Sequence, residues 1–281
     1  MKKQDMSNVN KTLYIPLYGK SYVSKRGLFL YDPKAEEIWE AEQFPLKGKS
    51  KSKYLAYYMG MRSAVFDAWV KAQMIFSEDA VIIHLGCGMD SRVLRVGESP
   101  LVWYDMDFPE VIEQRKRYYQ EDFRYRMIAA DVRDPVWLDQ IPQSKRAIVI
   151  MEGVSMYLTP EELKNIIQAV CDHFECVAWL MDCYSVLAAG LSRYKNPIND
   201  VGVTKVYGLD DPRSLTTEEF CFVREREIMP RSYVVRLRGL ERRIFSRLYA
   251  GKLSRSLYRM YEYEKRNYLY DSFFDPTADS E

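Results

Sequence analysis

Short apolar runs recur through the middle of the chain, and each ends at a glycine or an acidic residue. Apolar runs of this length are typical of strands that are buried on both faces of a parallel sheet. We therefore expect five strands in this region, over residues 80–86, 101–107, 125–131, 146–153 and 176–182.

Helix-like segments lie between these runs. Pro109 stands at the first turn of segment 109–120, where proline is favoured because its missing N–H has no partner to lose. Thr159 precedes segment 160–174 and Glu162 follows it by three residues, which is the spacing of a capping box. Strands that alternate with helices predict right-handed crossovers and a doubly wound α/β sheet.

The flanking regions predict further elements. Residues 32–41 and 54–73 read as helices, so the part before the core is expected to be mostly helical. After the core, 185–215 is irregular and is interpreted as an insertion or lid over the sheet edge. Beyond it we expect a sixth strand, basic helices, a last edge strand and a frayed end, over 220–228, 236–266, 266–274 and 275–281.

Composition narrows the partners and the location. Lys and Arg total 41 and Asp and Glu total 40, so a net charge of +1 gives no general attraction to nucleic acid or to an anionic membrane, and we expect neither as a partner. The polar N-terminus lacks the apolar segment of a secretory signal. Five cysteines without CxxC spacing and only two histidines argue against a disulfide framework and a metal centre, so we expect a cytoplasmic protein.

The segment HLGCGMDSR, 84–92, is the strongest local motif. Gly86 and Gly88 directly follow the first predicted strand, where a glycine turn lets the backbone approach a ligand and the next helix N-terminus presents free N–H groups. A dinucleotide site would carry a third glycine where Ser91 stands, and Asp90 would repel a pyrophosphate. The loop therefore favours a cofactor without phosphates.

Acidic residues end the next strands. Asp107 lies about 20 residues after the glycine loop, where an acid accepts the ribose hydroxyls of an adenosine cofactor, and we prefer it to Asp105 on the same strand face. Asp131 and Glu152 end the third and fourth predicted strands. Because ligands of open α/β sheets bind beyond the carboxyl ends of the strands, these acids and the glycine loop should line one crevice.

At this point the sequence resembles a known family, the leucine carboxyl methyltransferase type, which includes the tetracenomycin-type polyketide O-methyltransferases. The matching stretches occur in family order over roughly 12–163: TLYIPLYGKS, YDPKAEEI, MRSAVFD, LGCGMDSR, YDMDFPEVIEQRK, AADVRD and EGVSMYLTPEEL. The resemblance implies a Rossmann-like methyltransferase fold that binds S-adenosyl-L-methionine. It is weak beyond Asp182, in the region expected to select the substrate.

The resemblance also implies roles for individual residues. Arg62 matches the arginine that pairs with the methionine carboxylate of the cofactor, and Lys20 is the candidate for a second basic contact, with Lys25 and Arg26 close in sequence. The family's ribose acid falls on Asp107.

The adenine contact falls on Asp131 and the backbone of Val132, and Glu152 is expected near the methionine amino group. The EGVSMYL stretch supplies Tyr157 as the candidate substrate contact. We expect a single domain, 1–281, with a helical cap, a cofactor-binding core, and a region of substrate lid with C-terminal helices and strands, over 1–78, 79–183 and 184–281.

The expected reaction is O-methylation, with a carboxylate of a small molecule or natural product as the acceptor. A carboxylate has a reference pKa near 4, is ionised at neutral pH and needs no general base, which agrees with a sequence that offers no convincing catalytic histidine. No catalytic side chain is therefore assigned. His84 lies inside a predicted strand and His173 on a helix remote from the strand ends.

Several alternatives stay open. The acceptor could be the C-terminal carboxylate of a peptide or protein, for which the basic segment 236–259 offers a docking surface, although charge runs usually face solvent. A phenol acceptor would more often need a base, since its pKa is about 10. An NAD-dependent oxidoreductase and a non-catalytic binding module are the more distant readings. The sequence does not decide the oligomeric state.

Overall fold

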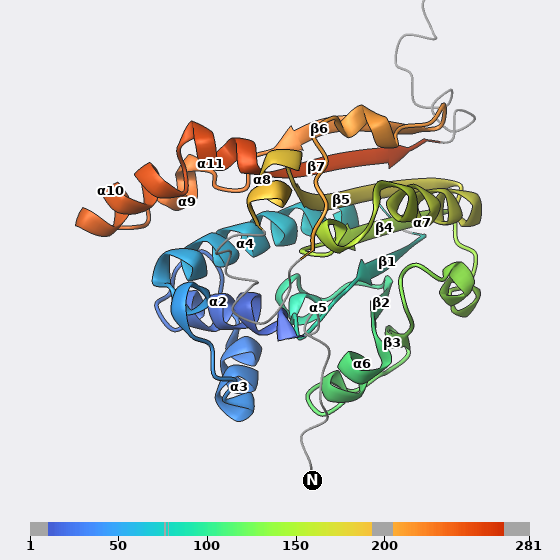
Figure 1. Ribbon diagram of the computed structural model, residues 1–281. Helices are drawn as coiled ribbons and strands as arrows, with labels where there is room; N and C mark the ends of the chain where they lie inside the picture. The colour runs from blue at the N-terminus through green and yellow to red at the C-terminus, as the bar shows by residue number, and fades with distance from the viewer. Residues whose placement is uncertain (1–10, 76, 78, 193–204, 267–281) are drawn as a thin grey trace, which may run out of the picture.

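Seven strands form one sheet in the computed structural model, which describes residues 11–75, 77, 79–192 and 205–266 (Figure 1). They are β1 (Ala80–Leu85), β2 (Val102–Asp107), β3 (Tyr125–Ala129), β4 (Arg146–Met151), β5 (Cys176–Tyr184), β6 (Phe220–Arg226) and β7 (Tyr258–Lys265). The order across the sheet is β3-β2-β1-β4-β5-β7-β6. Strands β1 to β5 pair in parallel, and β7 is antiparallel to both β5 and β6. The predicted fold class, a mostly parallel seven-stranded α/β sheet, is confirmed.

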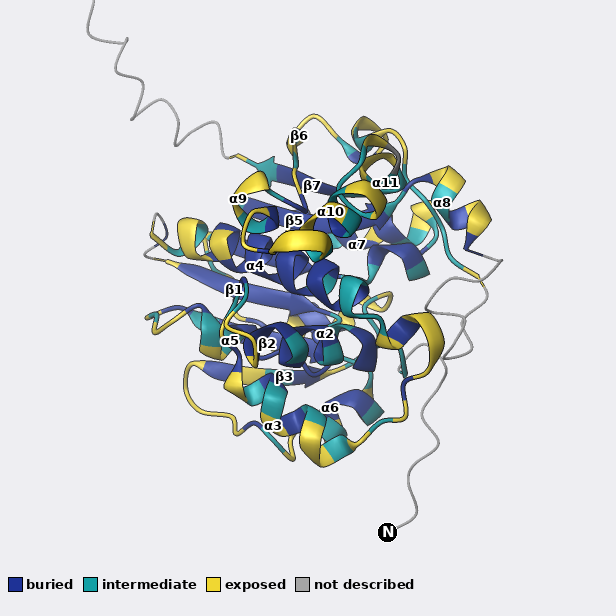
Figure 2. Ribbon diagram, turned by 90° about the vertical axis from the view of Figure 1, so that its left-hand side faces the viewer, coloured by how far each residue is buried: buried dark blue, intermediate teal, exposed yellow. Residues whose placement is uncertain are grey.

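The central strands are buried on both faces, as their apolar runs predicted. Successive side chains alternate between the faces. Ile82 and Ile148 pack in the apolar cluster that includes the N-terminal helices, whereas Ile83 and Val149 pack in the cluster that includes α7 (Pro160–His173). Figure 2 shows the strands as a buried layer with helices around it.

The N-terminal part is helical, as expected. The helices are α2 (Tyr14–Ser24), α3 (Pro33–Glu42), the 3-10 turn η1 (Gly48–Lys51) and α4 (Lys53–Ile75). Asp32 caps α3, because its carboxylate accepts a hydrogen bond of 2.8 Å from the backbone N–H of Ala35. The long helix α4 carries a buried face that runs from Leu55 to Val70 and packs beside the sheet.

The C-terminal part differs from the prediction. Residues 258–265, expected to end a basic helix, form β7 in the sheet interior. Alternating tyrosines favour a strand, and pairing with both β5 and β6 supplies the backbone hydrogen bonds, so tertiary context overrides the helical reading of a charged segment. The sixth strand is confirmed as β6, and the edge strand predicted at 266–274 falls, except for Arg266, outside the described residues.

Short elements complete the chain. After the core come α8 (Val186–Leu191) and the 3-10 turn η5 (Pro212–Leu215), and residues 193–204 of the predicted lid lie outside the described part. The basic segment forms α9 (Arg231–Val234), α10 (Gly239–Leu248) and α11 (Lys252–Leu257). Glu241 of α10 binds Lys53 Nζ at 2.6 Å and accepts a hydrogen bond of 2.8 Å from Tyr57, which fastens the C-terminal helices to α4.

The contribution of the α7 capping box to stability can be tested by mutation. Thr159 accepts a hydrogen bond from the backbone N–H of Glu162, and the Glu162 carboxylate accepts one from the backbone N–H of Thr159. We expect Thr159→Ala to lower the free energy of unfolding by about 1 kcal/mol in urea denaturation. Lys164→Ala, an exposed change on the same helix, is the control, and equal effects of the two changes would contradict a role for the cap.

Candidate active site at the strand ends

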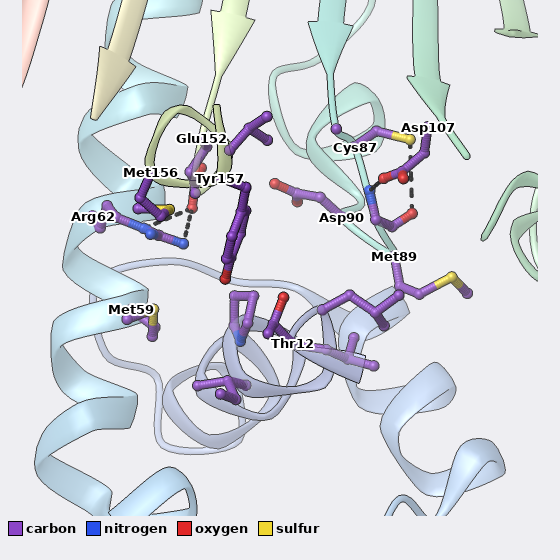
Figure 3. A pocket seen from close by; sticks show the side chains of 18 of the residues that line it. Thr12, Met59, Arg62, Cys87, Met89, Asp90, Asp107, Glu152, Met156 and Tyr157 are labelled. Carbon is purple, nitrogen blue, oxygen red and sulfur yellow. Dashed lines mark hydrogen bonds and ion pairs between the residues drawn. The ribbon is translucent and has the colours of Figure 1, made fainter. Parts of the chain in front are cut away.

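A cavity of about 900 Å³ lies at the carboxyl ends of β1, β2 and β4. Helices α2 and α4 close its other side, and Figure 3 shows α2 opposite the strand ends. This volume falls in the range of roughly 300–1,000 Å³ that is usual for cofactor and small-molecule sites. The cavity is lined by every residue that the sequence proposed for the site: Lys20, Arg62, Gly86, Gly88, Asp107, Asp131, Val132, Glu152 and Tyr157.

The glycine loop needs glycine for two different reasons. Gly86 and Gly88 both have positive φ, +66° and +52°, a region that other residues rarely adopt. A Cβ on Gly86 would also lie 2.2 Å from Cγ2 of Val154, in the loop after β4. The absence of a side chain at position 86 therefore lets the loops after β1 and β4 meet at the cavity.

Only one turn of helix follows this loop. The sequence predicted a helix N-terminus after the glycines, and α5 (Arg92–Arg95) does begin there, although it is only four residues long. Its side chains are held by buried partners: Ser91 donates a hydrogen bond of 2.5 Å to Asp32, and Arg92 and Arg95 pair with buried carboxylates. The loop is held by these contacts and not by a long helix.

The two acids of β2 have different surroundings. Asp107 lines the cavity and accepts hydrogen bonds from the backbone N–H groups of Gly88 and Phe108, at 2.7 and 2.8 Å. Burial outweighs these bonds and raises the pKa of Asp107 to about 6. Asp105 does not line the cavity and forms a buried ion pair with Arg115. Of the two acids, Asp107 is the one that reaches the cavity.

Arg62 joins helix α4 to two strand ends. Its Nε and Nη2 lie 3.0 Å from Oε1 of Glu152, and its Nη1 donates to Asp182 at 2.9 Å and to the hydroxyl of Tyr258 at 2.8 Å. Burial opposes ionisation of Glu152, but Arg92 and Arg62 outweigh it and hold the pKa of this carboxyl below its usual range. Much of the guanidinium fork is thus used inside the protein, and both Arg62 and Glu152 still border the cavity.

Lys20, the sequence's candidate for a second basic contact, lines the cavity beside an acidic partner. Its Nζ lies 3.1 Å from Asp90, and both side chains are almost fully buried. Burial lowers the pKa of Lys20, and the charge of Asp90 opposes that effect. Asp90, expected only to disfavour a pyrophosphate, also binds Arg92 and Arg95 at 3.2 and 2.7 Å.

The residues that follow β3 form a more exposed part of the cavity wall. Asp131 pairs with Arg133, whose Nε lies 2.9 Å from its Oδ1, and this hydrogen bond is the largest cause of the lowered pKa of Asp131. The carbonyl of Val132 accepts a hydrogen bond of 3.3 Å from the indole of Trp137. Both residues face the same cavity as Asp107.

The sequence missed an aromatic wall on the other side. Tyr58, Tyr184, Tyr249 and Tyr258 all line the cavity. In Figure 3, Tyr157 stands between the side chains of Met59 and Arg62 on one side and those of Cys87 and Asp107 on the other. The helical spacing of 54–73 placed Tyr58 on a buried face. Nothing in the sequence predicted that residues 184, 249 and 258 lie near it.

Comparison with known proteins identifies the family. A profile of the family described as leucine carboxyl methyltransferase matches residues 11–171. The tetracenomycin polyketide synthesis O-methyltransferase TcmP of Streptomyces glaucescens is 30% identical over 212 residues, which is 75% of this chain and 78% of that protein. The chain belongs to the leucine carboxyl methyltransferase family. It is an S-adenosylmethionine-dependent methyltransferase, as the resemblance implied.

Other relatives agree with this placement. The S-adenosyl-L-methionine-dependent methyltransferase dpfgK of Gibberella zeae is 33% identical over 153 residues, 49% of this chain and 51% of that protein. A crystal structure of a methyltransferase from Thermobifida fusca superposes with a TM-score of 0.54 at 14% identity, over 88% of this chain and 94% of the other. This likeness shows the shared fold, and the family assignment decides against the dinucleotide alternative.

Two negative findings concern the described residues alone. None of their helices is long and apolar enough to cross a membrane. They also contain no cluster of His, Cys, Asp and Glu side chains that could hold a metal ion.

The fit of Gly86 against Val154 can be tested directly. We expect Gly86→Ala to lower the free energy of unfolding by more than the ~1–2 kcal/mol that a positive φ alone costs a residue with a Cβ, and to weaken binding of S-adenosylhomocysteine. Gly27→Ala is the matched control, because Gly27 has φ +60° and no atom within 4 Å of the added Cβ.

The pair Gly86→Ala with Val154→Ala separates contact from backbone strain. Removing the two methyl groups of Val154 should restore part of the stability and binding lost in Gly86→Ala, as measured by denaturation and calorimetry. If Gly86→Ala and Gly27→Ala cost the same, the close approach of the two loops would have no energetic role.

Proposed function

We propose that this methyltransferase transfers the methyl group of S-adenosyl-L-methionine to a carboxylate oxygen of a small molecule. When bound, the cofactor supplies an electrophilic methyl group on a sulfonium, which an ionised oxygen displaces without prior loss of a proton. The observation that carries the proposal is the state of His84. It is the one histidine on the cavity wall among the described residues, and its ring lies between Asp105 and Arg92, at 3.2 and 3.3 Å. Burial lowers the pKa of His84. Since its two ring nitrogens face Asp105 and Arg92, His84 is not placed to take a proton from an acceptor, which favours an acceptor that is already ionised.

The residues at the strand ends fit the cofactor. Gly86 and Gly88 lie on the cavity wall without side chains, and the half-buried carboxylate of Asp107 can accept hydrogen bonds from a pair of ribose hydroxyls. Lys20 and Arg62 are proposed to meet the methionine carboxylate, and Glu152 the methionine amino group. Asp131 and the backbone of Val132 are proposed to meet the adenine.

The charge balance also fits. The buried ion pairs around Arg62 and Arg92 contain five carboxylates and four cations: Asp32, Asp67, Asp90, Glu152 and Asp182, with Lys20, Arg62, Arg92 and Arg95. This network therefore carries one excess negative charge. A cofactor with an ammonium, a sulfonium and one carboxylate brings one net positive charge, which compensates it.

The acceptor side is assigned to the aromatic wall. Tyr157 is proposed as a substrate contact, because it stands between the α4 side of the cavity and the glycine loop (Figure 3). A phenol acceptor would need a base, and the tyrosines on the wall do not provide one, since burial raises the pKa of Tyr157 and Tyr258. An already ionised carboxylate needs only proximity and partial desolvation.

The division of the chain and its location are part of the same proposal. We propose one domain, 1–281, with a cap at 1–78, a cofactor-binding core at 79–183 and a substrate-selecting part at 184–281. A cytoplasmic location is supported by the five cysteines, all of which are free thiols.

The choice of a carboxylate acceptor can be tested with methyl-labelled cofactor. We expect the enzyme to methylate members of a panel of aromatic and aliphatic carboxylic acids and not the matched phenols. The product ester should release labelled methanol in alkali, whereas an aryl ether would not. Carboxylate methylation should also proceed without net proton release, measured with an indicator dye in weak buffer. Base-stable label together with one proton per turnover would establish a phenol acceptor instead.

The ionisation of Asp107 predicts a pH dependence of cofactor binding. Its pKa in the folded chain is raised from 3.8 to about 6, so the stability tied to its protonated form is lost as the pH rises from about 4 through 6. Ribose hydroxyls would favour the ionised form. Binding of S-adenosylhomocysteine should therefore weaken below pH 6, by about tenfold at pH 5, in calorimetry.

The same experiment has a built-in control. Asp107→Asn keeps the shape of the side chain but cannot ionise, so its weaker binding should no longer vary between pH 5 and 7. A wild-type affinity that stays constant over this range would exclude Asp107 as the titrating ligand group.

A further inference from the structure

Tyr58 carries a buried hydroxyl for which the methyltransferase reaction has given no role so far. It lies on α4, one turn before Arg62, is only 6% exposed and lines the cavity. Among the residues that the structure describes, its hydroxyl has no hydrogen-bond partner. Buried hydroxyls are normally paired, because an unpaired one loses its bonds to water without replacement.

The neighbouring polar groups are already engaged. The ring of Tyr58 lies 5.9 Å from that of Tyr258 and 6.1 Å from that of Tyr249. The hydroxyl of Tyr258 donates to Asp182 at 2.5 Å and accepts from Nη1 of Arg62 at 2.8 Å. Tyr58 therefore packs against two tilted aromatic rings, and the hydroxyl of Tyr258 beside it already bonds to Asp182 and Arg62.

The position of Tyr58 separates it from the adenosine contacts. Its neighbours on α4, Met59 and Arg62, lie on one side of Tyr157 in Figure 3, whereas Cys87 and Asp107 lie on the other. Asp107 and the glycine loop belong to the side proposed for the ribose. The ring contacts of Tyr58 with Tyr249 and Tyr258 place it in the aromatic wall of the cavity.

We propose that Tyr58 binds the methyl acceptor, by donating a hydrogen bond to the acceptor carboxylate while the rings of Tyr249 and Tyr258 hold its apolar body. The inference rests on the proposed carboxylate transfer and adds the residue that orients the acceptor. Burial raises the pKa of Tyr58 well above its usual value, so the group stays a donor and does not act as a base. It is a positioning residue: one carboxylate oxygen is held so that the other is free to react.

The test uses the full chain saturated with S-adenosylhomocysteine and fluorine NMR of three probes: 4-fluorobenzoate, 4-fluorophenol and 4-fluoroanisole. We expect 4-fluorobenzoate to bind wild type and to bind Tyr58→Phe at least fivefold more weakly. The uncharged 4-fluoroanisole should bind both proteins equally, because it uses only the aromatic contacts. Tyr54→Phe is the matched control, since Tyr54 lies one turn earlier on α4 and does not line the cavity.

Two further measurements separate acceptor binding from a structural role. Tyr58→Phe should leave the affinity for S-adenosylhomocysteine unchanged and should not lower the melting temperature, because the buried hydroxyl it removes has no partner among the described residues. With an acceptor found in the labelled-cofactor screen, Tyr58→Phe should raise KM more than it lowers kcat.

The outcomes distinguish this inference from the proposed function. Equal binding of 4-fluorobenzoate to wild type and Tyr58→Phe, or no binding of any probe to wild type, would overturn the acceptor role of Tyr58. If 4-fluorophenol alone binds and Tyr58→Phe weakens it, Tyr58 keeps its role and the carboxylate acceptor is wrong. A fall in melting temperature with loss of S-adenosylhomocysteine binding would show that the hydroxyl supports the fold.

Discussion

The ion pairs around Arg62 and Arg92 hold the site together. Arg62 links α4 to Glu152 after β4 and to Asp182 in β5, and Arg92 links α5 to Asp67 in α4 and to Glu152. These groups are almost fully buried, so removing one partner would leave an uncompensated charge, typically at a cost of about 3–5 kcal/mol. The helical cap can therefore sit over the strand ends in only a narrow range of positions, and that position defines the cavity.

The sequence predicted the part of the site that follows from chain order. In a parallel sheet the carboxyl ends of neighbouring strands meet at one edge, so Gly86, Asp107, Asp131 and Glu152 had to lie near each other once the strands were recognised. The order β3-β2-β1-β4 confirms that reasoning. The position of Arg62 at this edge could not be predicted in the same way, because Arg62 lies outside the strands and their order says nothing about it. Only the family resemblance did so, and its partners Glu152 and Asp182 now supply the physical reason.

The aromatic wall could not be predicted, because it depends on contacts between distant segments. Residues 258–265 looked like the end of a basic helix, and only their pairing with β5 and β6 makes them a strand. That strand carries Tyr258 to Arg62 and Tyr58. The 22 tyrosines of the chain were an unexplained feature of its composition, and part of them form this wall.

The two sides of the cavity are built from different interactions, and this has a consequence for specificity. The cofactor side depends on directional ion pairs and on a glycine where any Cβ would meet Val154, so few substitutions are compatible with it. The proposed acceptor side depends mostly on contacts between aromatic rings, which prefer offset-stacked or edge-to-face arrangements. The match to the family profile ends at residue 171, before Tyr184, Tyr249 and Tyr258. Tyr258 belongs to both sides, since its ring faces the aromatic wall and its hydroxyl completes the pairing of Arg62 with Asp182. Tyr184 packs against the ring of Tyr258 and Tyr249 against those of Phe245 and Tyr54, whereas any replacement of Tyr258 must also satisfy the buried charges of Arg62 and Asp182.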